Sequence, residues 1–215
     1  MKIFVIIALL LVTILFSALP AQAEGKPVQL SLFSPVQLFA PEKSIAGLRL
    51  SLLYGKNVNM TGLDWGLVPH TTGNFTGLEV AAVGLVKGNA TGIQYGFGNV
   101  AGSLTGLQWG FANVSGAVEG VQLGGINVTG NMTGLQWSAI NISGETDGVQ
   151  FGWLNITGNM NIVQFGFGNI SGTAEGLQFG LVNVTGRMHG LQIGLINVIE
   201  KGGWFPVLPI VNGSR

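Results

Sequence analysis

The chain has 215 residues, of which 36 are glycine and only 8% carry a charged side chain. Nine basic and nine acidic residues give a formal net charge of zero, which excludes the basic surface that nucleic-acid binding needs. The sequence has no cysteine, which excludes disulfides, thiolate metal ligands and cysteine nucleophiles. A chain of this length forms one domain or two small ones.

The first 23 residues are typical of a secretory signal peptide. Lys2 precedes an apolar run over 3–16, and Pro20 is followed by the small-residue site Ala21-Gln22-Ala23. A basic start, a short apolar core and an A-x-A cleavage site define such a peptide. An uncleaved anchor is the alternative, although the run is short for a membrane span of about 20 residues. We therefore predict export, to the periplasm, the outer membrane or the cell surface.

A repeat occupies most of the remaining chain. Eight units of 14 residues follow one another from Gly92, and three looser units of about 15 residues begin at Gly47, Gly62 and Gly77. Counted from the opening glycine, position 3 is Gln and position 8 is Asn in all eight regular units. Position 4 is large and apolar, position 9 is Val or Ile, and position 10 is mostly Ser or Thr. Ile162 replaces the opening glycine in one unit.

This pattern predicts an all-β fold built as a β-solenoid. Apolar and polar residues alternate over short runs with the period of a strand, and so much glycine would cost a helix about 1 kcal/mol per residue relative to alanine. In a solenoid, coils of fixed length stack about 4.8 Å apart, so each residue lies over its counterpart. We expect about eleven coils over 47–201, a rod roughly 50 Å long. Cap strands are expected over 24–46 and a C-terminal cap over 202–215.

Stacked coils would align identical amides into ladders, in which each side chain donates to one neighbour and accepts from the other. Glycines at positions 1, 5 and 11 are expected at three turns, where they tolerate a positive φ. A large and a small residue tend to share positions 6 and 7, which predicts a shared packing space in the interior. The predicted ladder residues are Gln94, Gln108, Gln122, Gln136, Gln150, Gln164, Gln178 and Gln192, with Asn99, Asn113, Asn127, Asn141, Asn155, Asn169, Asn183 and Asn197.

An up-and-down β-meander or an outer-membrane β-barrel is the alternative architecture, with one antiparallel strand and one turn in each unit. Its function would be transport or anchoring. Neighbouring strands would then run in opposite directions, so the Gln and Asn columns would not align with themselves. The sequence therefore favours the solenoid.

The G-[LIV]-Q-x-G-x-x-N units resemble those of the bacterial surface-repeat proteins first described from spirochaetes. A Pro27-Val28-Gln29-Leu30 segment precedes the units, and a proline-rich tail closes them. The resemblance covers nearly the whole chain after the signal-like segment. It implies export and surface display, and it brings no established activity and no catalytic residues. The first three units depart from the pattern, with Arg49, Asp64 and Glu79 at the glutamine position.

The sequence contains no recognisable catalytic, cofactor-binding or metal-binding constellation. Neither of the two histidines lies at a metal-ligand spacing. Glu119, Asp147 and Glu175 occupy position 14 on alternate coils, which places them about 9–10 Å apart in a solenoid. Calcium needs ligand oxygens at about 2.3–2.6 Å, so this column cannot chelate one ion. Glu145 and Asp147 form one closer pair, where a calcium site is a minor alternative.

We therefore predict an exported, non-enzymatic protein with a structural, adhesive or surface-interaction role. We expect a partner in the envelope or on the cell surface, which the sequence does not identify. Association with a membrane and self-association through the solenoid ends are both compatible with the sequence. Position 8 and position 10 also spell N-x-[ST] in most units. If these positions flank an inward position 9, they form an outward array of amides and hydroxyls. Such an array would bind ice or a glycan, which is a minor alternative function.

Overall fold

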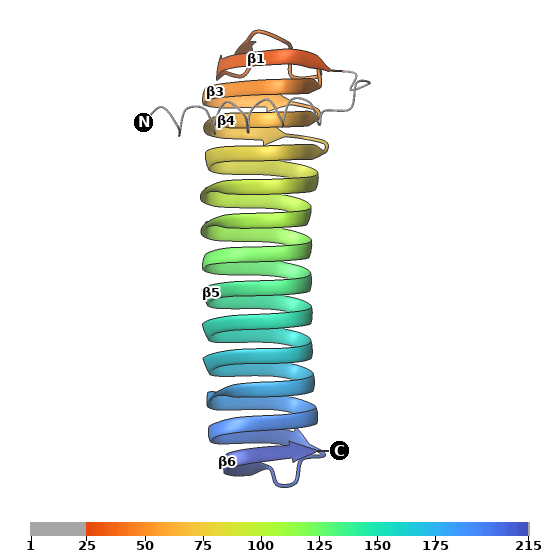
Figure 1. Ribbon diagram of the computed structural model, residues 1–215, viewed down its shortest axis with the longest axis vertical. Helices are drawn as coiled ribbons and strands as arrows, with labels where there is room; N and C mark the ends of the chain where they lie inside the picture. Colours follow the sequence, from red (N-terminus) through yellow and green to blue (C-terminus); the bar gives the residue numbers. More distant parts are fainter. Residues whose placement is uncertain (1–24, 215) are drawn as a thin grey trace, which may run out of the picture.

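The computed structural model describes residues 25–214, and this part of the chain is built from β-strands without a helix. In chain order the strands are β1 (Lys26–Phe33), β2 (Val36–Gln37), β3 (Ile45–Asn57), β4 (Met60–Thr71), β5 (Phe75–Lys201) and β6 (Val207–Ser214). The long strand β5 winds in successive coils around one axis, so the molecule is a rod (Figure 1). The predicted signal peptide lies outside the described residues.

Neighbouring coils run in the same direction. β1 pairs with β3, β3 with β4 and β4 with β5, all in parallel. The register places Gly47 opposite Gly62, and Gly62 opposite Gly77. The predicted β-solenoid is therefore confirmed, and the alternative of up-and-down antiparallel strands is wrong. Residues at the same position of successive units can stack on one another only when every coil runs in the same direction as the coil before it.

A reversed strand covers each end of the rod. β2 pairs antiparallel with β1, and β6 pairs antiparallel with the last part of β5, where Ser214 lies opposite Gly190. Proline has no N–H to donate to a further strand, and both Pro206 and Pro209 lie in the C-terminal segment. These ends limit the pairing of one rod with the edge of another.

Side-chain direction shows that each coil has three sides. In the regular units, positions 3, 8, 10 and 13 are buried, whereas positions 6 and 7 both face outward, as do positions 11 and 12. Two successive outward residues interrupt the strand alternation and mark a corner. The third corner lies at the opening glycine. The sides therefore extend over positions 2–6, 7–11 and 12–14.

Among the glycines that recur in the units, only the opening one is required by backbone conformation. From Gly47 to Gly190 these glycines have a positive φ, and a Cβ at any of them would lie 2.0–2.2 Å from a carbonyl oxygen of the previous coil. The prediction of positive φ at positions 5 and 11 is wrong, because neither position has one. Position 5 lies in the middle of a side and points inward. At Gly110 a Cβ would lie 2.6 Å from Asn99 Nδ2, so the asparagine column occupies the space that a side chain would need.

Positions 6 and 7 do not share an interior packing space, and that prediction is wrong. The side chain of Phe97 is 67% exposed, and its ring stacks on that of Phe111 with a centroid separation of 5.1 Å. The ring of Phe111 lies against Gly125 in the next coil, where a Cβ would come within 3.0 Å of the ring. The alternation of large and small residues at positions 6 and 7 thus allows side chains of neighbouring coils to pack against one another on the outer surface.

Replacing Ile162 by glycine is expected to stabilise the protein. Ile162 occupies the opening position with a φ of 105°. A branched residue in such a conformation costs on the order of 1–3 kcal/mol, part of which is offset by the greater freedom of glycine in the unfolded chain. We expect Ile162→Gly to raise the free energy of unfolding by about 1 kcal/mol, measured by denaturant titration. The control is Ile170→Gly in the middle of a side, which should lower it; a fall for both variants would contradict the strain at Ile162.

Candidate functional site

The interior of the solenoid contains a continuous column of glutamines. All eight at position 3 are fully buried, and from Gln108 to Gln192 each Nε2 donates to Oε1 of the glutamine one coil earlier at 2.7–2.8 Å. Gln94, the first in the column, donates to Oε1 of Glu79 at 2.8 Å. Each amide inside the rod is therefore satisfied by a copy of itself rather than by water.

The asparagines at position 8 form a second buried column with the opposite bond direction. From Asn99 to Asn183 each Nδ2 donates to Oδ1 of the asparagine one coil later, at 2.8–3.0 Å. Most also donate to a backbone carbonyl, as Asn141 does to Phe151 at 2.7 Å. Because the two columns donate in opposite directions, their amide dipoles oppose each other along the axis.

The ends of the two columns leave two buried oxygens without a partner. They are Oε1 of Gln192, the last of the glutamines, and Oδ1 of Asn99, the first of the asparagines. Each is the acceptor at the end of its column where no further amide donates. The structure thus places all sixteen predicted ladder residues in two columns and shows which end of each column is incomplete.

The outward array of amides and hydroxyls predicted as an alternative is wrong. Asn113 is fully buried, and Ser115 at position 10 donates to Gln108 Oε1 at 2.9 Å inside the rod. Val114 between them faces outward. Amides stacked at the coil spacing satisfy one another, so they can be buried while position 9 faces solvent. The buried asparagines of the N-x-[ST] triplets cannot contact ice or a glycan.

Three charged side chains continue the glutamine column at its N-terminal end. Arg49, Asp64 and Glu79 are fully buried. Arg49 pairs with both carboxylate oxygens of Asp64, with Nε donating to Oδ1 at 2.9 Å, and its Nη2 also donates to Thr71 Oγ1 at 2.8 Å. Burial and the nearby Asp64 carboxylate raise the pKa of Glu79 to about 8. Glu79 is therefore protonated at neutral pH, when it accepts the bond from Gln94.

These buried charges are enclosed by the coils. Within residues 25–214, no group of three or more His, Asp or Glu side chains lies close enough together to hold a metal ion. The same residues include no helix that is long and apolar enough to cross a membrane. The chemistry that the rod offers to a partner therefore lies on its outer surface.

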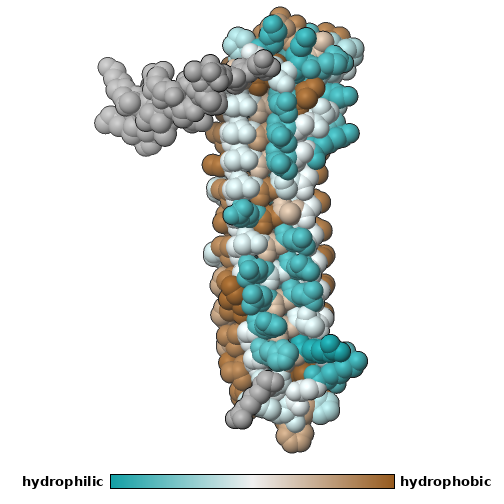
Figure 2. Space-filling model, turned by 90° about the vertical axis from the view of Figure 1, so that its right-hand side faces the viewer, coloured by the Kyte–Doolittle hydropathy of each residue, from teal (hydrophilic) through white to brown (hydrophobic). Residues whose placement is uncertain are grey.

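The outer surface carries most of the large apolar side chains. We define the apolar face as the outward residues at positions 2, 4, 6, 7 and 9 in 92–198, which cover two adjacent sides of the rod. No charged side chain occurs at these positions; within 92–198 the charges lie at positions 12 and 14 on the third side. Figure 2 shows hydrophilic residues in a stripe along the rod, with hydrophobic residues along one edge. All five tryptophans of the chain are exposed by 53–69%.

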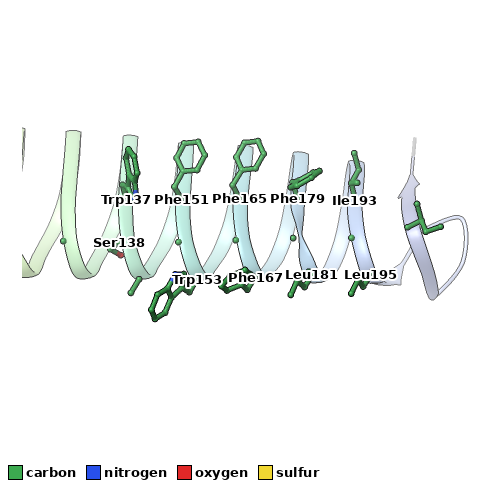
Figure 3. Close-up of a pocket in the computed structure, with 17 residues that line it drawn as sticks. Trp137, Ser138, Phe151, Trp153, Phe165, Phe167, Phe179, Leu181, Ile193 and Leu195 are labelled. Carbon is green, nitrogen blue, oxygen red and sulfur yellow. The ribbon is translucent and has the colours of Figure 1, made fainter.

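A groove of about 810 Å³ runs along the C-terminal half of the apolar face. One wall is the position-4 column, the other is the position-6 column, and the row of position-5 residues between them is the floor (Figure 3). We call this feature the axial groove. The larger wall residues are Trp137, Phe151, Phe165, Phe179 and Ile193 on one side, with Trp153, Phe167, Leu181 and Leu195 on the other. Phe151 and Phe165 stack nearly parallel, with ring centroids 5.0 Å apart.

Sequence analysis did not identify the apolar face or the axial groove. Strand alternation separates two sets of residues without saying which set faces the interior. A usable signal was present in the sequence, because positions 2 to 9 carry no charge over eight consecutive units while positions 12 and 14 do. Comparison with known proteins adds no relative: no family model, no curated protein and no solved structure matches the chain.

Interrupting the glutamine column is expected to destabilise the rod. Gln136→Met keeps the approximate size and shape of the side chain but removes the donor to Gln122 and the acceptor for Gln150. A buried polar group left unpaired costs about 1–3 kcal/mol, so we expect a loss of about 2–4 kcal/mol in the free energy of unfolding. The control is Leu135→Met on the outer surface, which should change it by less than about 0.5 kcal/mol. Equal effects of the two substitutions would contradict a stabilising role for the column.

The buried Glu79 is expected to make stability fall as pH rises. Its pKa is about 8 in the folded protein and 4.5 in its ordinary state, so folding retains a proton that the unfolded chain loses. The resulting stability is fully present below about pH 4.5 and is lost as pH increases through 8. Glu79→Gln keeps an acceptor for Gln94 and should weaken this decline, measured as free energy of unfolding at pH 5, 6.5 and 8. Exposed Glu145→Gln should retain the decline, and identical pH profiles for all three proteins would refute the assignment.

Proposed function

We propose that this chain is an exported, non-enzymatic rod that attaches to a lipid surface through its apolar face. The observation that carries the proposal is the division of the outer surface. Within 92–198, two adjacent sides present apolar and aromatic side chains without a charge, and the third side carries the charges. The signal-like segment and the resemblance to bacterial surface-repeat proteins support a location outside the cytoplasm.

The apolar face is available to a partner because it does not contribute to the interior. Soluble monomers rarely expose a contiguous apolar patch larger than a few hundred Å², and larger patches mark interaction surfaces. Here the interior is filled by the two amide columns and by the apolar column at position 13, so the outward apolar residues are not needed to form it. Tryptophan and tyrosine are typical of membrane–water boundaries, and Tyr95, Trp109 and Trp137 follow one another along the position-4 column with Leu123 between the tryptophans.

The shape of the face favours a fluid lipid phase over a rigid protein partner. Its two sides meet at the corner between positions 6 and 7, so the face is convex. A flat rigid partner would cover one side at a time, whereas lipid chains and headgroups can surround the corner and contact both sides. The third side, with Glu119, Asp147 and Glu175, would then face water and lie away from anionic headgroups.

Charge on the apolar face is expected to reduce binding to vesicles. The test variant is Tyr95→Asp with Trp109→Asp, both outside the axial groove. The control is Thr105→Asp with Thr133→Asp, which adds the same charge to the third side. Burying an aromatic side chain contributes about 1.5–3 kcal/mol, so we expect the test variant to lose at least about ten-fold in partition, while the control is unchanged.

Co-flotation with neutral phosphatidylcholine vesicles measures the partition, and a blue shift of tryptophan emission gives a second readout. Equal partition of the two variants would overturn the proposal. So would a wild-type protein that remains in the aqueous fraction and sediments as a dimer, because the face would then bind a second copy of the chain.

A further inference from the structure

We infer that the axial groove binds one extended hydrocarbon chain of a lipid, lying parallel to the axis of the rod. This inference rests on the proposed function in assigning the face to lipid, but it specifies a discrete site with a stoichiometry of one. The alternative within the same proposal is that the face contacts lipid everywhere without a defined site.

The length of the axial groove fits an acyl chain. Its position-4 wall extends from Trp137 to Ile193 over four coil-to-coil steps, roughly 19 Å at about 4.8 Å per step. The hydrocarbon core of a bilayer is about 30 Å thick, so one chain in one leaflet spans about 15 Å. Ile210 of β6 also lines the groove, which carries its apolar surface onto the C-terminal strand.

The groove begins at a defined point along the apolar face. Gly124 is its first floor residue, and the next residue, Gly125, leaves the position-6 wall without a side chain. The ring of Phe111 lies against Gly125 from the preceding coil. Beyond this point the position-6 wall begins with the small Ala139 and continues with Trp153, Phe167, Leu181 and Leu195, so the groove occupies the C-terminal part of the face.

The lining offers few groups that could recognise a polar ligand; its donors besides Ser138 are the indole N–H groups of Trp137 and Trp153 on the walls. No residue that lines the groove is charged, and Ser138 supplies its one side-chain hydroxyl. The single hydroxyl proton of Ser138 is already taken by the interior, where its two possible acceptors are Ile140 O at 2.6 Å and Asn141 Oδ1 at 2.8 Å. A ligand buried here would leave any polar group of its own without a partner, which costs free energy. The lining therefore selects a purely apolar chain.

A peptide does not fit the axial groove as a partner. The groove runs across the strands, and the backbone that forms its floor belongs to the continuous strand β5. This backbone is paired between coils, so it presents no open sheet edge to which a peptide could add. Peptide N–H and C=O groups held in the groove would be buried without partners. In the Phe151–Phe165 pair the ring faces are turned toward each other, so they are not presented to a sugar ring.

The test uses cis-parinaric acid, a fluorescent fatty acid, below the concentration at which it forms micelles. Energy transfer from Trp137 and Trp153 in the groove walls reports binding. We expect saturation at one molecule per chain. Phe167→Asp places a charge in the groove wall and should weaken binding at least ten-fold.

Phe97→Asp is the matched control and should change the affinity by less than two-fold. Both phenylalanines lie in a Gly-Phe-Gly-Asn segment at position 6, and their side chains are 61% and 67% exposed, but only Phe167 lines the groove. Both variants are first compared with the wild type by circular dichroism and thermal unfolding. If Phe167→Asp fails to fold, Leu181→Asp on the same wall replaces it.

Vesicle co-flotation of the same proteins separates the two proposals. A wild type that floats with vesicles but binds no fatty acid saturably, or that is weakened equally by both substitutions, overturns the groove and leaves the lipid-binding face intact. A wild type that binds one fatty acid per chain but does not float confirms the groove and overturns attachment to a lipid surface. Loss of fatty-acid binding in Phe167→Asp but not in Phe97→Asp, together with flotation of the wild type, supports both.

Discussion

Between the ends of the two columns, each buried amide is satisfied by the same amide one coil away, and this requirement determines how the coils are arranged. A glutamine or asparagine side chain needs a donor and an acceptor at fixed distances, and both are supplied when an identical residue lies directly before and after it. From Gln94 onward the partners are a constant 14 residues apart, which keeps them in register. The 14-residue unit, its single direction and the inward glycine at position 5 all keep the two columns aligned. At Gly110 a Cβ would lie 2.3 Å from Gly96 O and 2.6 Å from Asn99 Nδ2, and the one side chain at position 5, that of Ser138, is small and hydrogen-bonds to the asparagine column.

The polar interior has a direct consequence for the outer surface. Here one apolar column, with Leu104, Met132 and Met188 at position 13, lies in the core, but most of the large apolar residues occupy the opposite phase of the strand and face outward. Two of the three sides become apolar, and the charges are confined to the third within 92–198. The same alternation that buries the amides therefore creates the apolar face. Function, in our proposal, follows from residues that the interior does not require.

The N-terminal end shows how such a column can begin. Every glutamine donates toward the N-terminus, so the first one needs an acceptor before it. Glu79 supplies that oxygen and stays neutral at pH 7 because burial and Asp64 raise its pKa. Asp64 in turn is paired with Arg49. The three charged residues that interrupt the repeat thus connect a neutral column to a buried ion pair. At the other end no such device is present, and Gln192 Oε1 has no partner.

The sequence by itself determined the repeat length, the parallel stacking and the residues that share a column. Stacking like over like imposes one period on every position, and that period can be counted, as between Gln108 and Gln122. Only the tertiary structure decided which residues face inward, because strand alternation has two phases and a shift of one residue exchanges them. The assumption of an inward position 9 therefore placed Asn113 outside, although its stacked copies allow full burial. The axial groove could not be inferred either, since its walls combine residues from successive coils and exist only once the corner between positions 6 and 7 is formed.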